Sequence, residues 1–359
     1  PFDELRNINL RKRLRLHQKK QRLRDALADD LVGLILSAHW LHFPRFVSVA
    51  ALRLDFFASA VIIMIHLYQK INKESSMHRK ITADSSANLY RKDFPNFTPV
   101  PLKIVTSEKE YTDDENLDVA AMQSELERYK GISSSSCPAV ADWLNAFGSA
   151  DEIFAVALTS RLSGCFNAAQ IAAADYVQEH PGRRVFVLDS LSTGPELELL
   201  VEYLHTLLPT QRSFDEVCSA LSIYSRHTHL AFSLASLSNF AKNGRVSPLL
   251  AKAVGLLGIR VVGRASAEGE LEAQHKCRGE KAAIQKLLDG MLAGGFAGGK
   301  VRIRHSFNPQ AAELLAERIL ERFPDCDIKI GENHGLCVFY AEKGGILVGF
   351  EDGAPQENA

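Results

Sequence analysis

Short apolar strands alternate with helical patterns along the first half of the sequence that follows Met77. Strands are predicted at residues 79–83, 153–158 and 185–188, and helices at 168–179, 196–208 and 214–224. The strand Val-Phe-Val-Leu at 185–188 is apolar on both faces, which is typical of a buried parallel strand. This alternation predicts βα units around a largely parallel sheet.

The second half predicts another α/β arrangement, with an open mixed sheet and helices mainly on one face. Its predicted strands are 258–263, 270–276, 300–305, 327–330, 336–340 and 346–350. Its predicted helices are 249–257, 280–292 and 309–322. We therefore predict two α/β domains, a parallel-sheet domain at residues 77–225 and a mixed-sheet domain at residues 226–359.

The first 76 residues differ from the rest of the chain. A basic run between Arg11 and Arg24 precedes an apolar stretch at 31–68, and neither has clear element boundaries. One interpretation is a basic amphipathic membrane anchor. We favour another, in which Met77 is the native start and residues 1–76 are upstream sequence translated in error. Lys73 and Glu74 can be encoded by a purine-rich ribosome-binding sequence, with two serine codons as the spacer.

The net charge and the cysteine spacing indicate which partners and which cellular compartment to expect. The 42 Lys and Arg residues balance 43 Asp and Glu residues, so the overall charge favours neither nucleic acid nor an acidic lipid surface as a partner. The six cysteines are scattered and form no Cys-x-x-Cys motif, which favours a reducing compartment. The best apolar window, residues 56–69, is shorter than the roughly 20 residues of a membrane span. We expect a cytoplasmic protein without nucleic acid or stable membrane insertion.

Small hydroxyl residues recur in four loops, at residues 84–86, 133–136, 159–164 and 189–194. We expect all four at the carboxyl ends of parallel strands, where open α/β sheets bind ligands. Hydroxyl groups and the free N–H groups of helix N-termini make a neutral site for a carboxylate or a phosphate. One such loop alone is more simply explained as a helix cap. Four together predict an anion site.

One of these loops carries a family signature. Residues 157–169, Ala-Leu-Thr-Ser-Arg-Leu-Ser-Gly-Cys-Phe-Asn-Ala-Ala, resemble the Ser-Ser-x-Leu-Ser-Gly-Thr-Tyr-x-x-Ala signature of the DegV family of bacterial fatty-acid-binding proteins. Further family marks follow in the expected order at 82–89, 99–102, 111–113, 188–192, 237–247 and 277–282. The resemblance covers about residues 78–350.

The resemblance implies two α/β domains with a fatty acid in a tunnel between them. In the family, a Thr-Ser-x-Pro turn and the Ser-Gly of the signature hold the carboxylate; residues 135–138 and 163–164 match them. The Asn-Gly-Arg at 243–245 matches a Gly-Gly-Arg turn at the tunnel mouth, and the Asp-Ser at 189–190 matches another family mark. The predicted binding residues are Ser135, Ser136, Ser163, Gly164, Ser190 and Arg245.

The sequence departs from the family pattern at several places. Cys165 replaces a Thr, Asn243 replaces the first Gly of Gly-Gly-Arg, and Gly194-Pro195-Glu196 replaces a frequent Ser-x-Gly. The C-terminal His-x-Gly-Pro-Gly turn aligns with a segment that begins at Tyr340 and lacks both the His and the Pro. Fatty-acid binding needs only the serine donors, whereas transfer of the acid to a kinase loses support without the His.

We expect a non-enzymatic protein, without cofactor or metal, that binds a long-chain fatty acid such as palmitate or oleate. Each buried CH₂ contributes about 0.8 kcal/mol, so neutral hydroxyls suffice to orient the head group. Two alternatives stay open: the acyl-presenting subunit of a bacterial fatty-acid kinase, and an enzyme or binder acting on a small anion. Serine hydrolysis is disfavoured, because the chain has no G-x-S-x-G motif and no His near the serine loops in sequence.

Other motifs are interpreted as structural. The acidic turn at 111–115 is predicted to be a solvated loop. The histidines at 227 and 229 have no Cys or carboxylate at ligand spacing, so we predict no metal there. Trp143 and Phe154 have the spacing of core residues.

Overall fold

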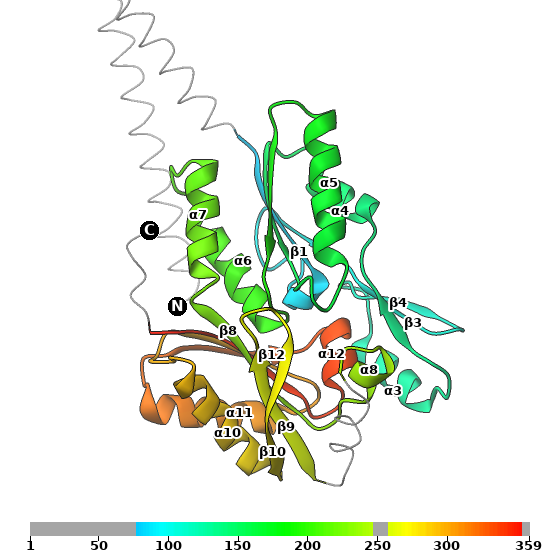
Figure 1. Cartoon of the computed structure of the whole chain (residues 1–359), viewed down its shortest axis with the longest axis vertical. Helices are drawn as coiled ribbons and strands as arrows, with labels where there is room; N and C mark the ends of the chain where they lie inside the picture. Colours follow the sequence, from blue (N-terminus) through cyan, green and yellow to red (C-terminus); the bar gives the residue numbers. More distant parts are fainter. Residues whose placement is uncertain (1–76, 247–257, 354–359) are drawn as a thin grey trace, which may run out of the picture. The chain divides into compact units, whose positions relative to one another are not determined.

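The computed structural model describes residues 77–246 and 258–353. These residues form two larger β-sheets with helices packed on them, and a small third sheet (Figure 1). The predictions for residues 1–76 and the helix predicted at 249–257 lie outside the described residues.

The first sheet is four-stranded and parallel, in the order β2-β1-β6-β7. Its strands are β1 (Arg79–Asp84), β2 (Phe97–Val100), β6 (Glu152–Ala157) and β7 (Arg184–Asp189). β1, β6 and β7 confirm the predicted parallel sheet. β2 was not predicted, because its four residues include Pro99, and a proline is tolerated in a sheet mainly on an edge strand, which is where β2 lies.

Four helices flank this sheet, with α4 (Val140–Phe147) and α5 (Cys165–Glu179) on one side of it (Figure 1). α6 (Pro195–Leu207) and α7 (Phe214–Tyr224) lie on the other side. The predicted capping box of α7 is confirmed, since the Ser213 hydroxyl accepts the Glu216 N–H at 3.3 Å. Trp143 and Phe154 are fully buried, as predicted for core residues.

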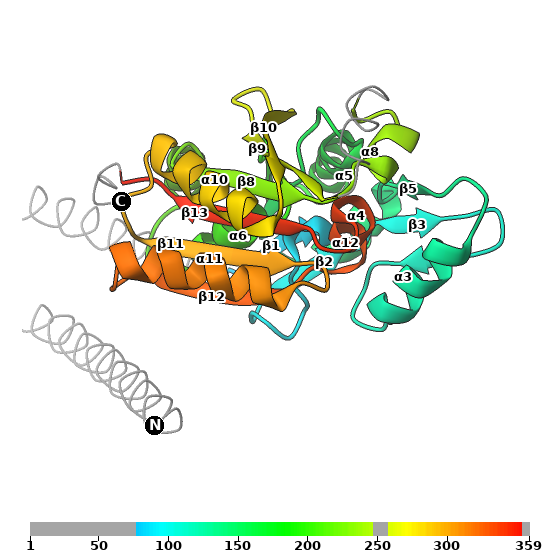
Figure 2. The same cartoon turned by 90° about the horizontal axis from the view of Figure 1, so that it is seen from below.

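The second sheet is six-stranded, in the order β10-β9-β8-β13-β11-β12, and only its β11–β12 pair is parallel within the described residues. Its strands are β8 (Thr228–Leu234), β9 (Ile259–Ala265), β10 (Leu271–Arg278), β11 (Lys300–His305), β12 (Asp327–Glu332) and β13 (Ile346–Glu351). α10 (Glu280–Ala293) and α11 (Pro309–Arg322) cover its outer face (Figure 2). This is the predicted mixed sheet with helices mainly on one face.

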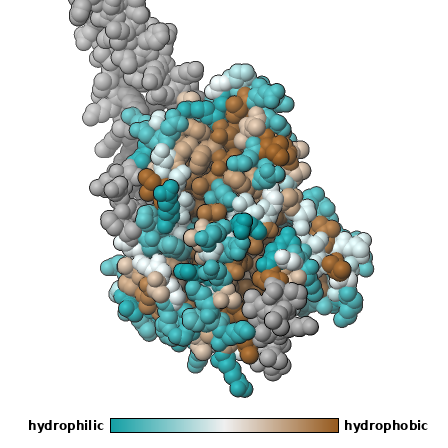
Figure 3. Space-filling view, viewed as in Figure 1, coloured by the Kyte–Doolittle hydropathy of each residue, from teal (hydrophilic) through white to brown (hydrophobic). Residues whose placement is uncertain are grey.

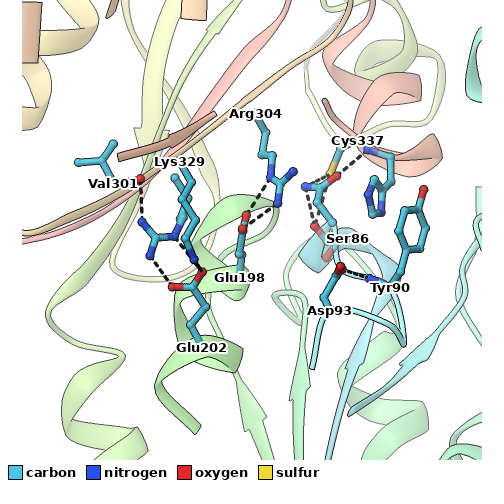
Figure 4. A network of polar contacts seen from close by, with 12 residues as sticks. Ser86, Tyr90, Asp93, Glu198, Glu202, Val301, Arg304, Lys329 and Cys337 are labelled. Carbon is cyan, nitrogen blue, oxygen red and sulfur yellow. Dashed lines mark hydrogen bonds and ion pairs between the residues drawn. The ribbon is translucent and has the colours of Figure 1, made fainter. Parts of the chain in front are cut away.

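α6 lies between the two larger sheets and packs against strands of both. Ten of its residues are buried, including Glu196, Glu198 and Glu202. Two of these carboxylates pair with cations from the second sheet (Figure 4). Glu198 accepts from Arg304 Nε at 2.8 Å and from Arg304 Nη2 at 2.7 Å. Glu202 accepts from Arg302 Nε at 3.0 Å and from Lys329 Nζ at 2.7 Å. Burying these carboxylates without cationic partners would be strongly unfavourable. The ion pairs therefore favour the observed packing of α6 against the second sheet.

The third sheet is small and antiparallel, with β3 (Lys103–Val105) between β4 (Glu110–Thr112) and β5 (Ser134–Ser136). The serine run was predicted at the carboxyl end of a parallel strand, and that prediction is wrong. It forms β5, which pairs antiparallel with β3. Short elements complete the described residues: η2 (Ser85–Ala87), α3 (Val119–Arg128), α8 (Ser238–Lys242) and α12 (Gly335–Ala341).

The strand predicted at 336–340 is wrong, since these residues belong to helix α12. Five consecutive apolar residues carry no periodicity, and six of the seven helix residues are buried, so pattern alone cannot separate strand from helix here.

The acidic turn at 111–115, predicted to be a solvated loop, is not fully solvated. Asp113 is 3% exposed, and its carboxylate accepts the N–H groups of Gly335 and Leu336 at 2.7 and 3.0 Å. Asp113 therefore caps α12.

The surface seen in Figure 3 is mainly polar, with hydrophobic patches between the polar residues. Several exposed large hydrophobic side chains belong to helices that flank the first sheet, namely Ile171 and Val177 on α5 and Ile223 on α7. Scattered exposures of this kind are normal for a folded domain and indicate no particular partner.

Candidate functional site

A cavity of about 300 Å³ has a lining drawn from segments around both larger sheets. This cavity, which is called the tail cavity below, is mostly apolar. Its larger apolar side chains are Leu102, Leu158, Leu162, Leu230, Phe232, Leu234, Phe240, Leu271, Leu336 and Leu347. β8 and β13 form one wall, where Phe232 pairs in register with Leu347. A concave apolar site with a few polar groups is the usual form of a small-molecule pocket.

The polar side chains of the tail cavity come from segments far apart in the sequence. They are Ser135, Ser136, Ser163, Thr193, Arg245 and Tyr340. Contacts join most of these segments beside α8. Ser135 Oγ lies 2.7 Å from the Tyr340 hydroxyl, and the Tyr340 ring lies 4.8 Å from the ring of Phe240 on α8. Arg245 Nε, just after α8, donates to the Leu162 carbonyl at 3.4 Å. Apart from Thr193, the polar groups thus gather near the end of β8 that leads into α8.

The loop before α5 brings Ser163 and Gly164 to this polar end. The Ser163 hydroxyl accepts the Cys165 N–H at 3.2 Å, which satisfies a free donor at the helix start. A Cβ placed on Gly164 would lie 3.2 Å from Cys137 Sγ, tighter than most contacts of a real Cβ. Gly164 therefore lets the signature loop pack closely against the turn that follows β5.

Tyr340 and Arg245 determine the electrostatics of the polar end. Burial raises the pKa of Tyr340, while its hydrogen bond with Ser135 and the charge of Arg245 act in the opposite direction. The phenol is therefore neutral and can donate a hydrogen bond. Within the described residues Arg245 has no carboxylate partner, and its guanidinium hydrogen-bonds to backbone carbonyls. One cation and several hydroxyls can thus receive an anionic head group.

Five of the six predicted site residues line the tail cavity: Ser135, Ser136, Ser163, Gly164 and Arg245. The sixth, Ser190, lies elsewhere. Its hydroxyl donates to the Ser192 carbonyl and accepts the Ser192 N–H, both at 3.1 Å, and it lines a different cavity. Ser190 follows β7 as expected, but its hydroxyl serves its own turn. Thr193, further along the same loop, reaches the tail cavity instead.

The loop at 84–86 is also absent from the lining of the tail cavity. Asp84 is buried, and its carboxylate accepts the Leu158 N–H and the Ser86 hydroxyl, both at 2.6 Å. Burial raises the pKa of Asp84 to about 6. The expectation that all four hydroxyl loops form one site is therefore wrong for this loop, which instead ties β1 to the loop after β6.

Sequence reasoning missed the hydroxyl group of Tyr340. It treated this position as the loss of the family His, whereas the structure places a neutral donor there, beside Ser135. The alignment with the family His was the signal that could have identified it. None of the hydroxyls of Ser135, Ser136 and Ser163 is hydrogen-bonded to a histidine in the part of the chain that the structure describes.

The described residues contain neither a cluster of metal-ligating side chains nor a helix that could span a membrane. Across residues 77–246 and 258–353, no three His, Cys, Asp or Glu side chains form a group that could hold a metal ion. His227 and His229 both contact the carboxylate of Asp352, at 3.2 and 3.1 Å. In the same ranges, none of the helices has the length and apolar character that crossing a membrane requires.

Comparison with known proteins identifies the family. The model of a family described as "Uncharacterised protein, DegV family" matches residues 78–351. The chain belongs to the DegV family. A DegV domain-containing protein of Streptococcus pneumoniae is 42% identical over 276 residues, which are 76% of this chain and 98% of that protein. Another, from Streptococcus gordonii, is 38% identical over 278 residues, 76% of this chain and 99% of the relative.

Two crystal structures of DegV relatives superpose well on this chain. One is a DegV family protein from Eubacterium eligens loaded with heptadecanoic acid, with TM-score 0.75, 41% identity, and coverage of 76% of this chain and 99% of that chain. The other is the Streptococcus pneumoniae Fatty Acid Kinase (Fak) B3 protein loaded with linoleic acid, with TM-score 0.75, 42% identity, and coverage of 77% and 99%. The DegV fold of two α/β domains predicted from the sequence is confirmed.

Proposed function

We propose that this protein binds a long-chain fatty acid in the tail cavity, without a cofactor. The observation that carries the proposal is an apolar cavity whose polar groups gather at one end. The carboxylate would lie among Ser135, Ser136, Ser163 and Arg245, and the tail would run along β8. Two DegV relatives that are at least 41% identical were crystallised with heptadecanoic and linoleic acid, which supports this assignment.

The physical chemistry of the site favours binding. A buried tail contributes about 0.8 kcal/mol per CH₂, so ten methylenes supply about 8 kcal/mol before the entropy of binding is subtracted. The head group adds orientation, because a carboxylate without partners is expensive to bury. Three hydroxyls, one phenol and one guanidinium provide those partners. A serine nucleophile would need an adjacent base, and the hydroxyls of Ser135, Ser136 and Ser163 are hydrogen-bonded to other groups.

Mass spectrometry of an organic extract of the purified full-length protein tests the proposal. We expect a fatty acid at close to one molecule per chain. Ser163→Ala should weaken binding of added oleate by about 1 to 3 kcal/mol, because a buried carboxylate oxygen loses a donor. Ser160→Ala is the matched control, since Ser160 is exposed in the same loop and is absent from the cavity lining. An empty extract, together with no binding of added palmitate or oleate, would refute the proposal.

A second candidate function is presentation of the bound acid to a separate fatty-acid kinase. The name of the Fak B3 relative and the position of Arg245 in the cavity wall support it. With a kinase from the same host, ATP and saturating oleate, Arg245→Ala should slow phosphorylation of the carboxylate more than it weakens oleate binding. Equal rates for wild type and Arg245→Ala would argue against this role.

A third candidate is a small anionic ligand held by the same donors. Competition between oleate and short anions such as acetate or phosphate separates it from the lipid proposal. Displacement of oleate by phosphate at similar concentration would favour the small anion.

A cytoplasmic location is part of our proposal and is supported by six cysteines that are all unpaired.

A further inference from the structure

A second cavity, of about 570 Å³, lies next to the tail cavity. Among the described residues, Leu230 is the side chain common to the linings of both cavities, and it is 1% exposed. The two cavities differ in character. The second includes Ser190, Thr228 and the buried Glu196, whose carboxylate accepts the Thr228 hydroxyl at 2.9 Å. Leu230 therefore separates an apolar space from a more polar one.

The position of Leu230 along β8 places it far from the polar end of the tail cavity. Side chains two residues apart share one face of a strand, about 6.7 Å apart. On this face Leu234 and Phe232 line the tail cavity, Leu230 lines both cavities, and Thr228 lines the second. Leu234 is next to the α8 end of the strand, where Tyr340, Ser135 and Arg245 gather. Leu230 is thus about 13 Å further along the strand, where the methyl end of a bound tail would arrive.

The volume of the tail cavity indicates the length of tail that it accommodates. A benzene molecule occupies an engineered cavity of about 150 Å³, which corresponds to about 25 Å³ per carbon. The 300 Å³ tail cavity therefore holds about 12 carbons, so the last carbons of palmitate or oleate would reach Leu230. Past Leu230, hydroxyls and a buried carboxyl group make the environment unfavourable for methylenes, so each carbon beyond it should add less affinity than a carbon before it.

We propose that Leu230 sets the chain-length preference of this protein by closing the tail cavity against the second cavity. This inference rests on the proposed fatty-acid binding and specifies which acids are preferred. Leu230→Ala removes three carbons from the wall, so the optimal acid should become about three carbons longer. Leu230→Phe adds volume at the same point and should move the optimum to shorter acids. Each additional methylene that is buried should raise affinity about fourfold, the equivalent of 0.8 kcal/mol.

The test uses the delipidated full-length protein and a series of saturated acids of about ten to twenty carbons, with the dissociation constant measured for each. Leu234→Ala is the matched control, because it removes the same atoms from the same face of β8 near the polar end. We expect a longer optimum for Leu230→Ala, a shorter one for Leu230→Phe, and a smaller change for Leu234→Ala than for Leu230→Ala. Circular dichroism tests whether each variant is folded. If Leu230→Ala is unfolded, the change in the optimal chain length of Leu230→Phe alone tests the role of Leu230.

Two results would overturn the inference, and they are distinguishable. If the wild type binds fatty acids but its optimum is unchanged in the folded Leu230 variants, Leu230 does not set length, while the proposed function stands. The same holds if Leu234→Ala shifts the optimum as much as Leu230→Ala. If the wild type binds no acid of the series, the proposed function fails and the role of Leu230 fails with it.

Discussion

Glu196 offers a quantitative test of how α6 is held between the sheets. Its carboxylate is buried and accepts hydrogen bonds from the hydroxyls of Ser192 and Thr228. Within the described residues it has no cationic partner, and burial raises its pKa from 4.5 to about 7. A difference of about 2.5 pH units corresponds to about 3 kcal/mol of unfolding free energy.

The sign of the effect follows from proton binding. Between pH 4.5 and 7 the folded protein keeps a proton on Glu196 that the unfolded chain releases, so the unfolded state binds fewer protons. The contribution of Glu196 is therefore most favourable below pH 4.5, and it is lost progressively as the pH rises to about 7. Glu196→Gln keeps an acceptor for the hydroxyls but has no proton to lose. Relative to wild type, the variant should gain about 3 kcal/mol between pH 4.5 and pH 8.

Urea unfolding of wild type and Glu196→Gln at several pH values between 4.5 and 8 measures this difference. Glu268→Gln is the control, because it makes the same substitution at an exposed glutamate. A constant difference between wild type and Glu196→Gln across this range would refute the reasoning. It would mean that the carboxylate is solvated or paired when the protein is folded.

Three further predictions concern other buried polar groups. Asp113→Ala removes the cap of α12 and should lower the free energy of unfolding by about 1 kcal/mol or more in urea; an unchanged midpoint would contradict the capping role. Glu202→Ala leaves Arg302 buried with only Asp327 as a carboxylate partner and should cost about 3 kcal/mol, measured in the same way. A loss below 1 kcal/mol would mean that Asp327 and water compensate. Tyr340→Phe should weaken oleate binding by about 1 kcal/mol in a titration, and equal affinity would remove the phenol from the head-group site.

Much of the fold could be predicted because local patterns and packing agree. β6 is an apolar run that is buried along its whole length, and β7 carries the apolar run Val-Phe-Val-Leu, so both strands could be predicted from local sequence. α12 was predicted wrongly because its environment, rather than its sequence, selects the helix. Asp113, more than 200 positions away in sequence, supplies the acceptor that satisfies its first N–H groups. No local pattern contains that information.

The residues of the candidate site could be predicted where they belong to loops with a recognisable sequence motif. Ser163 and Gly164 were found by the signature, and Ser135 and Ser136 by the match of their turn to a family motif. Ser190 has the right position after a strand, but the direction of its hydroxyl depends on the turn at Leu191, whose φ is +51°. Such a backbone conformation is uncommon outside glycine and is hard to predict from sequence. The role of Tyr340 in the site depends on its contact with Ser135, which is 205 positions away in the sequence.

The position of α6 has a consequence for how the molecule folds. We propose a domain boundary between residues 225 and 226, yet α6, which precedes it, also covers the inner face of the sheet that follows it. A fragment ending at that boundary would expose the buried carboxylates of α6, and a fragment starting there would expose the apolar face of β8 and β13. The two halves therefore depend on each other for a solvent-shielded core. We therefore expect the two α/β parts that the topology shows to unfold together in one cooperative transition.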